Sequence, residues 1–535
     1  MCNVLEKFID EASEQFQEVG LTPPDGLTKA NGITDLLEFL YDYIDEDNHD
    51  NRLENNLLSE LLIELIPESQ LRDGGFLVNP DVIEKNLDVP YPIVLLSDSH
   101  PSVRQEINTT VRYIGGKATA ITVMGGEAIL KGQRSLFVGP GCDACAIDVS
   151  LITVDNDGTL TALRCPKVTA LEGSDIFALD SLIEVEGDCL VNARCGTRVI
   201  ALGENMDLTL EPGALAVVRH SFPIKGREDA TVIQTVDMDG EMEAELLGRV
   251  RSMDCVPRDP RAVNTLPELI ELCHDAILKE NIPHADIIAR GIKSCKDYET
   301  LAKVITSHFG RFRDTFPFRA VVDSLPPETL YQNNIFTNRS APDHITPGQV
   351  AHVFGNVTLP EKWVFLTRLH LHDHAVAIGH GQMPIKAWDR SVTQCHGTSD
   401  VLAVGDSFVI ADGRTKLETW DNARFYARGL SEVICNGHSN GVLLENARVD
   451  AGDRSRVHVK SVSRSAFFDE SRALIEDPRA SYVAWQKAEV SVLGEPRGQS
   501  FDDSVIRTTN GMETFRKWVA AFDETDHPLS RTISR

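Results

Sequence analysis

Residues 366–461 divide into twelve consecutive octads: LTRLHLHD, HAVAIGHG, QMPIKAWD, RSVTQCHG, TSDVLAVG, DSFVIADG, RTKLETWD, NARFYARG, LSEVICNG, HSNGVLLE, NARVDAGD and RSRVHVKS. Apolar or small residues occupy the fourth and sixth positions of most octads, and Gly or Asp is common at the eighth. This alternation predicts a strand with one buried face, and the Gly or Asp predicts the turn after it. Because strand and turn leave no space for a helix, the repeat predicts a β-solenoid.

The outward residues at positions three and five differ between alternate octads. One set is mostly charged and pairs Arg368 with His370, Pro384 with Lys386, Asp400 with Leu402, Lys416 with Glu418, Glu432 with Ile434, and Arg448 with Asp450. The other is largely apolar and pairs Val376 with Ile378, Val392 with Gln394, Phe408 with Ile410, Arg424 with Tyr426, Asn440 with Val442, and Arg456 with His458. A chemical period of sixteen predicts two octads per coil. The array is then a two-sheet roll, roughly 30 Å long at about 4.8 Å between strands.

A less regular octad pattern covers residues 118–218 and predicts a second solenoid of the same kind. Its inward fourth positions begin at Ala120, Ala128, Leu136 and Ala144, and Thr122 and Leu130 lie two residues beyond the first two of them. Cysteines at inward positions are predicted to be core residues in both arrays, namely Cys142, Cys189, Cys395 and Cys435.

Apolar stripes at helical spacing and Pro- or Gly-rich breaks predict the other segments. Thr265 and Glu268 have the spacing of a capping box at a helix start. A short helix is expected at 471–476 and an amphipathic helix at ETFRKWVAAF, residues 513–522. The fold prediction is a mainly β chain with helical segments: an acidic helical domain at 1–75, a mixed connector at 76–117, the first octad β-solenoid at 118–218, a strand-then-helical insert at 219–365, the second octad β-solenoid at 366–461, and a mixed or helical C-terminal cap at 462–535.

The charge balance narrows the possible partners. The chain has 52 Lys and Arg against 81 Asp and Glu, a net charge of −29. Direct binding to nucleic-acid phosphates needs a basic face, so we expect none. The acidic amphipathic N-terminus does not resemble a signal peptide, and no long apolar run predicts a membrane span. With eleven cysteines and no signal, a reducing, cytoplasmic location is expected.

Histidines at the start of the second array are the main candidates for metal chemistry. His370, His372, Asp373 and His374 resemble the His-x-His-x-Asp-His signature of metallo-β-lactamase-like hydrolases, but His-Leu-His-Asp-His is one residue short. The octad pattern also turns His370 and His372 outward, to solvent. His380 and His396 share a position one coil apart, so their side chains are expected to lie roughly 5 Å apart. Two imidazoles are too few ligands for four-coordinate zinc. We therefore predict no catalytic residue, metal or cofactor, with these five histidines as weak metal candidates.

The octads resemble those of short-repeat β-solenoid proteins encoded by actinobacteria and their phages. The resemblance covers the two arrays and implies architecture only, with no catalytic residue to carry over. Two other protein classes are similar in shape or charge only, and their sequence motifs are lacking here. They are the bactofilins, whose β-helices polymerise, and the pentapeptide-repeat proteins, whose acidic rods resemble DNA.

The functional prediction is a non-enzymatic scaffold or protein-interaction protein. Its binding or self-association face is expected on the apolar outward positions, where it packs either on a partner or on the chain's own helices. This face comprises Val376, Ile378, Val392, Phe408, Ile410 and Tyr426. The first alternative is an acidic, nucleic-acid-mimicking inhibitor of a DNA-binding protein. The second is a glycan-acting hydrolase or lyase on the solenoid, which needs a cluster of acidic or His side chains.

Overall fold

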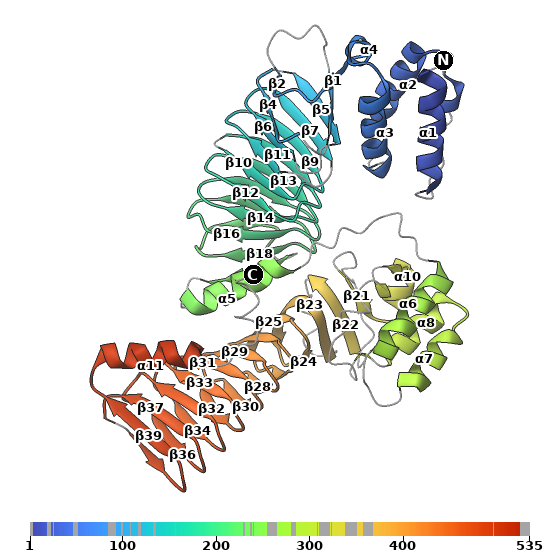
Figure 1. Ribbon diagram of the computed structural model, residues 1–535. Coiled ribbons are helices and arrows are strands. Elements are labelled where there is room, and N and C mark those ends of the chain that lie inside the picture. Colours follow the sequence, from blue (N-terminus) through green and yellow to red (C-terminus); the bar gives the residue numbers. More distant parts are fainter. Residues whose placement is uncertain are drawn as a thin grey trace. The chain divides into compact units, whose positions relative to one another are not determined.

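The computed structural model describes residues 4–524 with gaps, the longest of which are 46–51, 84–91, 254–264, 310–320, 338–349 and 357–367. The chain forms two compact units, Met1–Val263 and Asn264–Arg535, which we describe separately. Both are dominated by long parallel sheets, so the chain has a repeat β architecture with helical segments (Figure 1). Among the described residues, no helix has the length and apolar character needed to cross a bilayer.

Helices begin unit 1, as the apolar stripes predict. They are α1 (Val4–Glu18), the 3₁₀ helix η1 (Leu27–Lys29), α2 (Ile33–Asp45), α3 (Arg52–Leu65) and α4 (Glu68–Asp73). Their apolar faces share a core that includes Phe8 and Leu61. Ile93 and Leu95, from the outer face of strand β3 (Ile93–Leu96), belong to the same core. The helices therefore cover the outside of the first strands (Figure 1).

Two ten-stranded parallel sheets make up the rest of unit 1, and consecutive strands alternate between them. The first sheet contains β1 (Phe76–Val78), β3, β5 (Thr110–Gly115), β7 (Glu127–Lys131), β9 (Asp143–Ile147), β11 (Thr159–Leu163), β13 (Asp175–Leu179), β15 (Leu190–Ala193), β17 (Asp207–Leu210) and β19 (Ile224–Lys225). The second contains β2 (Val82–Ile83), β4 (Ser102–Gln105), β6 (Ala120–Val123), β8 (Ser135–Val138), β10 (Leu151–Val154), β12 (Val168–Ala170), β14 (Leu182–Val185), β16 (Arg198–Ala201), β18 (Leu215–Val218) and β20 (Thr231–Gln234). The paired strands thus begin before residue 118 and continue past residue 218.

The register of unit 1 corrects one detail of the octad prediction. Ile121 and Val123 point into the core, whereas Ala120 and Thr122 were expected there. Ile121 pairs with Leu136, only fifteen residues along, instead of sixteen. Because side chains alternate along a strand, this one-residue slip exchanges the inward and outward faces of β6.

Helix α5 (Gly240–Ser252) follows the last strand of unit 1. Arg198 on β16 is 3 % exposed, and its Nη1 donates hydrogen bonds to the carbonyls of Val250, at 2.9 Å, and of Met253. These carbonyls lie at the C-terminal end of α5, where no intrahelical donor reaches them. A buried cation therefore fixes the helix to the sheet.

Unit 2 begins with helices and continues as one long run of parallel strands. The helices are α6 (Leu266–Lys279), α7 (Ala285–Lys293), α8 (Tyr298–Thr306) and α10 (Pro327–Gln332). The strands are β21 (Ile335–Phe336), β22 (Val350–Asn356), β23 (Arg368–Gly381), β24 (Pro384–Ala387), β25 (Val392–Gly397), β26 (Asp400–Ala403), β27 (Phe408–Ala411), β28 (Lys416–Thr419), β29 (Arg424–Ala427), β30 (Glu432–Cys435), β31 (Asn440–Leu443), β32 (Arg448–Ala451), β33 (Arg456–Val459), β34 (Arg464–Phe467), β35 (Arg472–Ile475), β36 (Ser481–Ala484), β37 (Glu489–Leu493), β38 (Arg497–Ser500) and β39 (Val505–Thr509). At the first helix, the Thr265 N–H donates to Glu268 Oε2 at 2.5 Å, which is one of the two capping-box hydrogen bonds. The Thr265 hydroxyl also donates to Glu268 Oε2, at 3.0 Å.

From β24 onward, each strand of unit 2 pairs with the next strand but one, which gives two walls. Lys386 on β24 pairs with Leu402 on β26, and Ile378 on β23 pairs with Gln394 on β25. Both partners lie sixteen residues along, as the alternating chemistry predicts. We call the outer face of β24, β26, β28, β30, β32 and β34 the charged wall, and that of β25, β27, β29, β31, β33 and β35 the apolar wall.

Strand β23 contributes to both walls because it turns a corner. Leu369 pairs with Ile385 on one wall, and Val376 pairs with Val392 on the other. Between them Asp373 has a φ of 54°, a left-handed conformation that Asp tolerates better than most residues. Later corners repeat this geometry at the predicted turn positions, for example at Gly405 with φ 74°.

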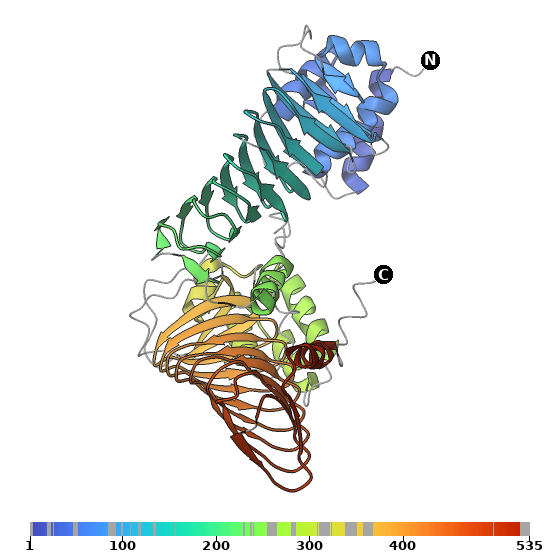
Figure 2. The ribbon, with the colours of Figure 1, turned by 90° about the vertical axis from the view of Figure 1, so that its left-hand side faces the viewer.

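The C-terminal region corrects a second expectation. The short helix expected at 471–476 is instead β35, in which Arg472 pairs with Arg456 of β33. Ala473 and Ile475 point inward and join the core, so pairing with the preceding strands determines the conformation. The predicted terminal helix forms as α11 (Met512–Glu524) and runs along the stack of strands (Figures 1 and 2).

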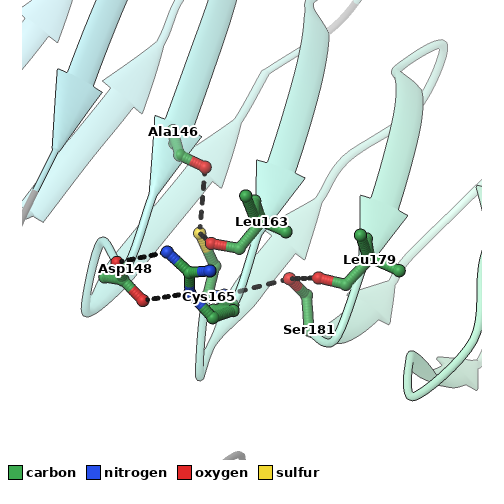
Figure 3. Close-up of polar contacts among 7 residues, drawn as sticks. Ala146, Asp148, Leu163, Cys165, Leu179 and Ser181 are labelled. Atoms are coloured by element: carbon green, nitrogen blue, oxygen red, sulfur yellow. Dashed lines mark hydrogen bonds and ion pairs between the residues drawn. The ribbon is translucent and has the colours of Figure 1, made fainter. Parts of the chain in front are cut away.

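Polar contacts close the turns of unit 1, as Figure 3 shows around Cys165. Ser181 Oγ accepts a hydrogen bond from the Cys165 N–H at 2.9 Å and donates one to the Leu179 carbonyl at 2.9 Å. The Cys165 thiol lies 3.5 Å from the carbonyl oxygens of Ala146 and Leu163. Both Ser181 and Cys165 are fully buried, so no solvent can replace these partners.

Replacing Ser181 with alanine is expected to lower the free energy of unfolding by about 1–2 kcal/mol, because the buried Cys165 N–H loses its acceptor. Urea denaturation monitored by circular dichroism measures the change. Ser252→Ala is the matched control, since Ser252 Oγ donates to the Arg249 carbonyl on an exposed helix end. Equal losses in the two variants would contradict the role given to the Ser181 hydroxyl.

Candidate functional site

The charged wall carries an open groove of about 930 Å³. Its lining follows the stack from β23 to β34, and the side chains form columns because paired residues lie sixteen apart. The outward lining residues are Arg368, His370, Pro384, Lys386, Asp400, Leu402, Lys416, Glu418, Glu432, Ile434, Arg448, Asp450, Arg464 and Ala466.

One column alternates in sign, and the other combines charge with apolar side chains. Ile434, at the middle of the groove, is 50 % exposed. Burial, and the negative charge of Glu432, raise the pKa of Asp450. The first column alternates in sign over Asp400, Lys416, Glu432 and Arg448, and is bounded by Pro384 at one end and by Arg464 at the other. The mixed column contains Lys386, Leu402, Glu418, Ile434 and Asp450. The groove is therefore an extended surface of both signs with an apolar centre.

The apolar wall, where the sequence placed the interaction face, is largely buried. Val376 and Val392 are 0 % exposed, Ile410 is 2 % exposed, and Phe408 and Tyr426 are 3 % exposed. Ile378 is partly exposed. Farther along the wall, the α11 side chain Phe515 lies with its ring 6.4 Å from that of His458. In unit 2, the wall that remains open is therefore the charged one.

Three histidines come together where the helices of unit 2 meet the first strands. His352 on β22 pairs in register with His370 on β23, and Phe354 pairs with His372. One nitrogen from each imidazole lies within 4.8 Å of the other two. His352 Nδ1 and His372 Nε2 are 3.0 Å apart. We call His352, His370 and His372 the histidine cluster.

Burial keeps the cluster neutral. Desolvation lowers the pKa of His352 to about 3, with a smaller contribution from His370. Desolvation also lowers the pKa of His370 to about 4, with smaller contributions from the positive charges of Lys386 and Arg368. His372 is fully buried, and its pKa lies well below the usual value for the same reason. A neutral imidazole has one lone-pair nitrogen, which is the form that binds a metal ion.

Aromatic rings surround the cluster on the outside of the strands. Phe354 stacks on His372 with ring centres 4.9 Å apart, and Phe309 approaches the rings of His352 and His372 to 5.0 and 5.1 Å. Phe309 and Phe354 belong to the core of the helices α6, α7 and α8. His372 does point away from the strand core, as predicted, but the helical segment covers it, so the expected exposure to solvent is wrong.

The other candidate histidines lie elsewhere. His374 follows the corner of β23, and its Nδ1 is 2.7 Å from Asp373 Oδ1. His380 pairs in register with His396 as expected, but the side chain of His380 lies outside the described residues. His396 Nδ1 is 3.5 Å from Asp412 Oδ2. Only His370 and His372 of the five predicted candidates join the described cluster.

His352 was missed from the sequence, although a signal was present. Residues 350–356 read VAHVFGN, and the inward pair Ala351 and Val353 has the same spacing as Leu369 and Leu371. Aligning these pairs places His352 beside His370. The segment lies outside the uninterrupted octads and pairs eighteen residues from β23, so the strict period of eight did not include it.

A scan against protein-family models, a search of curated proteins and a search of solved structures each gave no match.

Proposed function

We propose that the chain is a non-enzymatic repeat scaffold that binds a protein partner along the groove of the charged wall. In this proposal each strand array is an octapeptide-repeat β-solenoid with two octads per coil. The register of sixteen residues supports that description. The observation that carries the function is the open groove on one wall while the other wall is largely buried.

The occupant that fits the groove best is an amphipathic helix of mixed charge. Helices lie on the outer faces of strands at several places: α3 on β3 and β5, α5 on β16, and α11 beside β37 and β39. The α-helix has a pitch of about 5.4 Å, close to the strand spacing of about 4.8 Å, so one helical turn lies over each strand. The alternating column favours a helix whose charges alternate in the opposite order.

Ile434 is the central contact in this proposal. An exposed apolar residue ringed by charges suits the apolar stripe of a docked helix, and such central contacts contribute most to affinity. A lysine at this position would replace the apolar contact with a charged side chain between Glu418 and Asp450. We expect Ile434→Lys to weaken binding at least tenfold, which corresponds to about 1.4 kcal/mol.

Selection from a displayed library of host-protein fragments on the immobilised full chain tests the proposal. Enriched fragments are then made as peptides and titrated by calorimetry, with helix formation followed by circular dichroism. Leu190→Lys is the matched control, because Leu190 lies on a strand of unit 1 with a similar exposure, 46 %. Failure to enrich any fragment, or equal affinity for Ile434→Lys and wild type, would contradict binding in the groove.

A further inference from the structure

We propose that His352, His370 and His372 bind a divalent transition-metal ion. This inference goes beyond the scaffold function and does not depend on it. Imidazole nitrogens are typical ligands for Zn²⁺ and for the neighbouring divalent metals, and three of them with one open position form a recognised ligand set.

The spacing of the nitrogens suits such an ion. Zinc–nitrogen bonds of about 2.0–2.1 Å in a tetrahedral site place ligand nitrogens about 3.3 Å apart. His352 Nδ1 and His372 Nε2 are 3.0 Å apart, and the His370 nitrogen is within 4.8 Å of both. A small rotation of the His370 side chain, on the more open side of the cluster, would complete the set.

Unpaired polar atoms point to a missing ligand. His370 Nδ1 and His372 Nδ1 are buried and have no hydrogen-bond partner within the described part of the chain. A buried polar group without a partner costs about 1–3 kcal/mol, so each of these nitrogens is unfavourable in a protein core. An ion bound through His370 Nδ1 would pair that nitrogen and repay its cost, whereas His372 would bind through Nε2 and keep its Nδ1 unpaired.

The residues around the histidine cluster exclude water on one side and leave access for a metal ion on the other. Phe309 and Phe354 cover one side of the cluster, which strengthens metal–ligand electrostatics by excluding water. His370 also lines the groove of the charged wall, so an ion and a fourth ligand from solvent can reach it there. A second group, Glu271, His274 and Asp275, lies at the surface of α6 and serves as an internal comparison.

Metal titration of the chelator-treated full chain tests the proposal. Zn²⁺ is added in a calorimeter, and Co²⁺ is added while its visible absorption reports coordination by nitrogen. We expect one equivalent of each ion to bind. Losing an outer-sphere partner costs 10–100-fold in metal affinity, so losing a ligand in His370→Gln should cost at least about 100-fold.

Two further variants make the outcome decisive. His372→Phe preserves the ring volume against Phe354 and should also abolish the cobalt bands, with near-UV circular dichroism checking that it folds. His274→Gln removes the surface group and should bind as wild type does. Wild-type protein that takes up no stoichiometric metal would overturn the site. So would binding that survives His370→Gln and His372→Phe but is lost in His274→Gln.

Discussion

Replacing Phe425 with alanine is expected to lower the free energy of unfolding of unit 2 by about 3–5 kcal/mol, the usual cost of emptying an aromatic position in a core. Phe425 is 1 % exposed and lies between the walls of the second array. Its paired neighbour one coil along is Gly441, at a position that is Val409 one coil before Phe425 and Val457 one coil after Gly441. A side-chain carbon on Gly441 would overlap the Phe425 ring, so the ring occupies the space of two coils.

This sharing of space predicts that the two positions are coupled. Gly441→Val alone should be strongly destabilising, because the added methyl groups overlap the ring. In Phe425→Ala the same valine has space to enter. The double variant is therefore expected to be more stable than the sum of the single changes by at least about 1–2 kcal/mol.

Guanidinium denaturation of the four proteins measures this coupling in a double-mutant cycle. Val433→Ala with Gly441→Val is the matched control, because Val433 lies in the same core on the other wall and does not pair with Gly441. Strict additivity in the Phe425 cycle would show that the ring does not fill the space above Gly441.

Replacing Arg198 with methionine is expected to cost about 2–3 kcal/mol, since hydrogen bonds from charged groups are about twice as strong as neutral ones. The variant keeps the apolar part of the side chain but leaves the carbonyls of Val250 and Met253 without this donor. Helix α5 should then detach more readily from β16. Hydrogen exchange of the α5 amides, together with the denaturation midpoint, reports both effects.

Arg251→Met is the control for Arg198, because it removes a second arginine that joins the same helix to the sheet. Arg251 Nε is 2.8 Å from Glu184 Oε1, but the pair is exposed. Exposed ion pairs contribute about 0–1 kcal/mol. If both variants lost the same stability, burial of Arg198 would not be the cause of its effect.

Periodicity allowed much of the β architecture to be predicted. The alternation at Ile385, Val401 and Leu417 sets the inward face, and the change in outward chemistry every eight residues sets the pairing at sixteen. The prediction failed at two places, and only the first of them departs from the sixteen-residue pairing. At β6 a fifteen-residue spacing exchanged the faces, and at 471–476 a helical reading overlooked continued pairing with β33.

The histidine cluster could be predicted only in part. His370 and His372 were singled out as possible ligands, and their outward direction was correctly derived from Leu369 and Leu371. An outward side chain is exposed to solvent only on an isolated sheet. Phe309, far from them in sequence, closes over the same face, and His352 arrives from a strand outside the regular octads.

The sequence by itself determined the local alternation and the sixteen-residue pairing, because the side-chain direction in a strand depends only on the neighbouring residues. Tertiary structure alone decided which outer wall is covered and which histidines meet. It also decided that the Phe425 ring fills the space beside Gly441. Those outcomes depend on contacts between segments that are distant in the chain. A local sequence pattern does not determine which distant segment packs on the strand that it predicts.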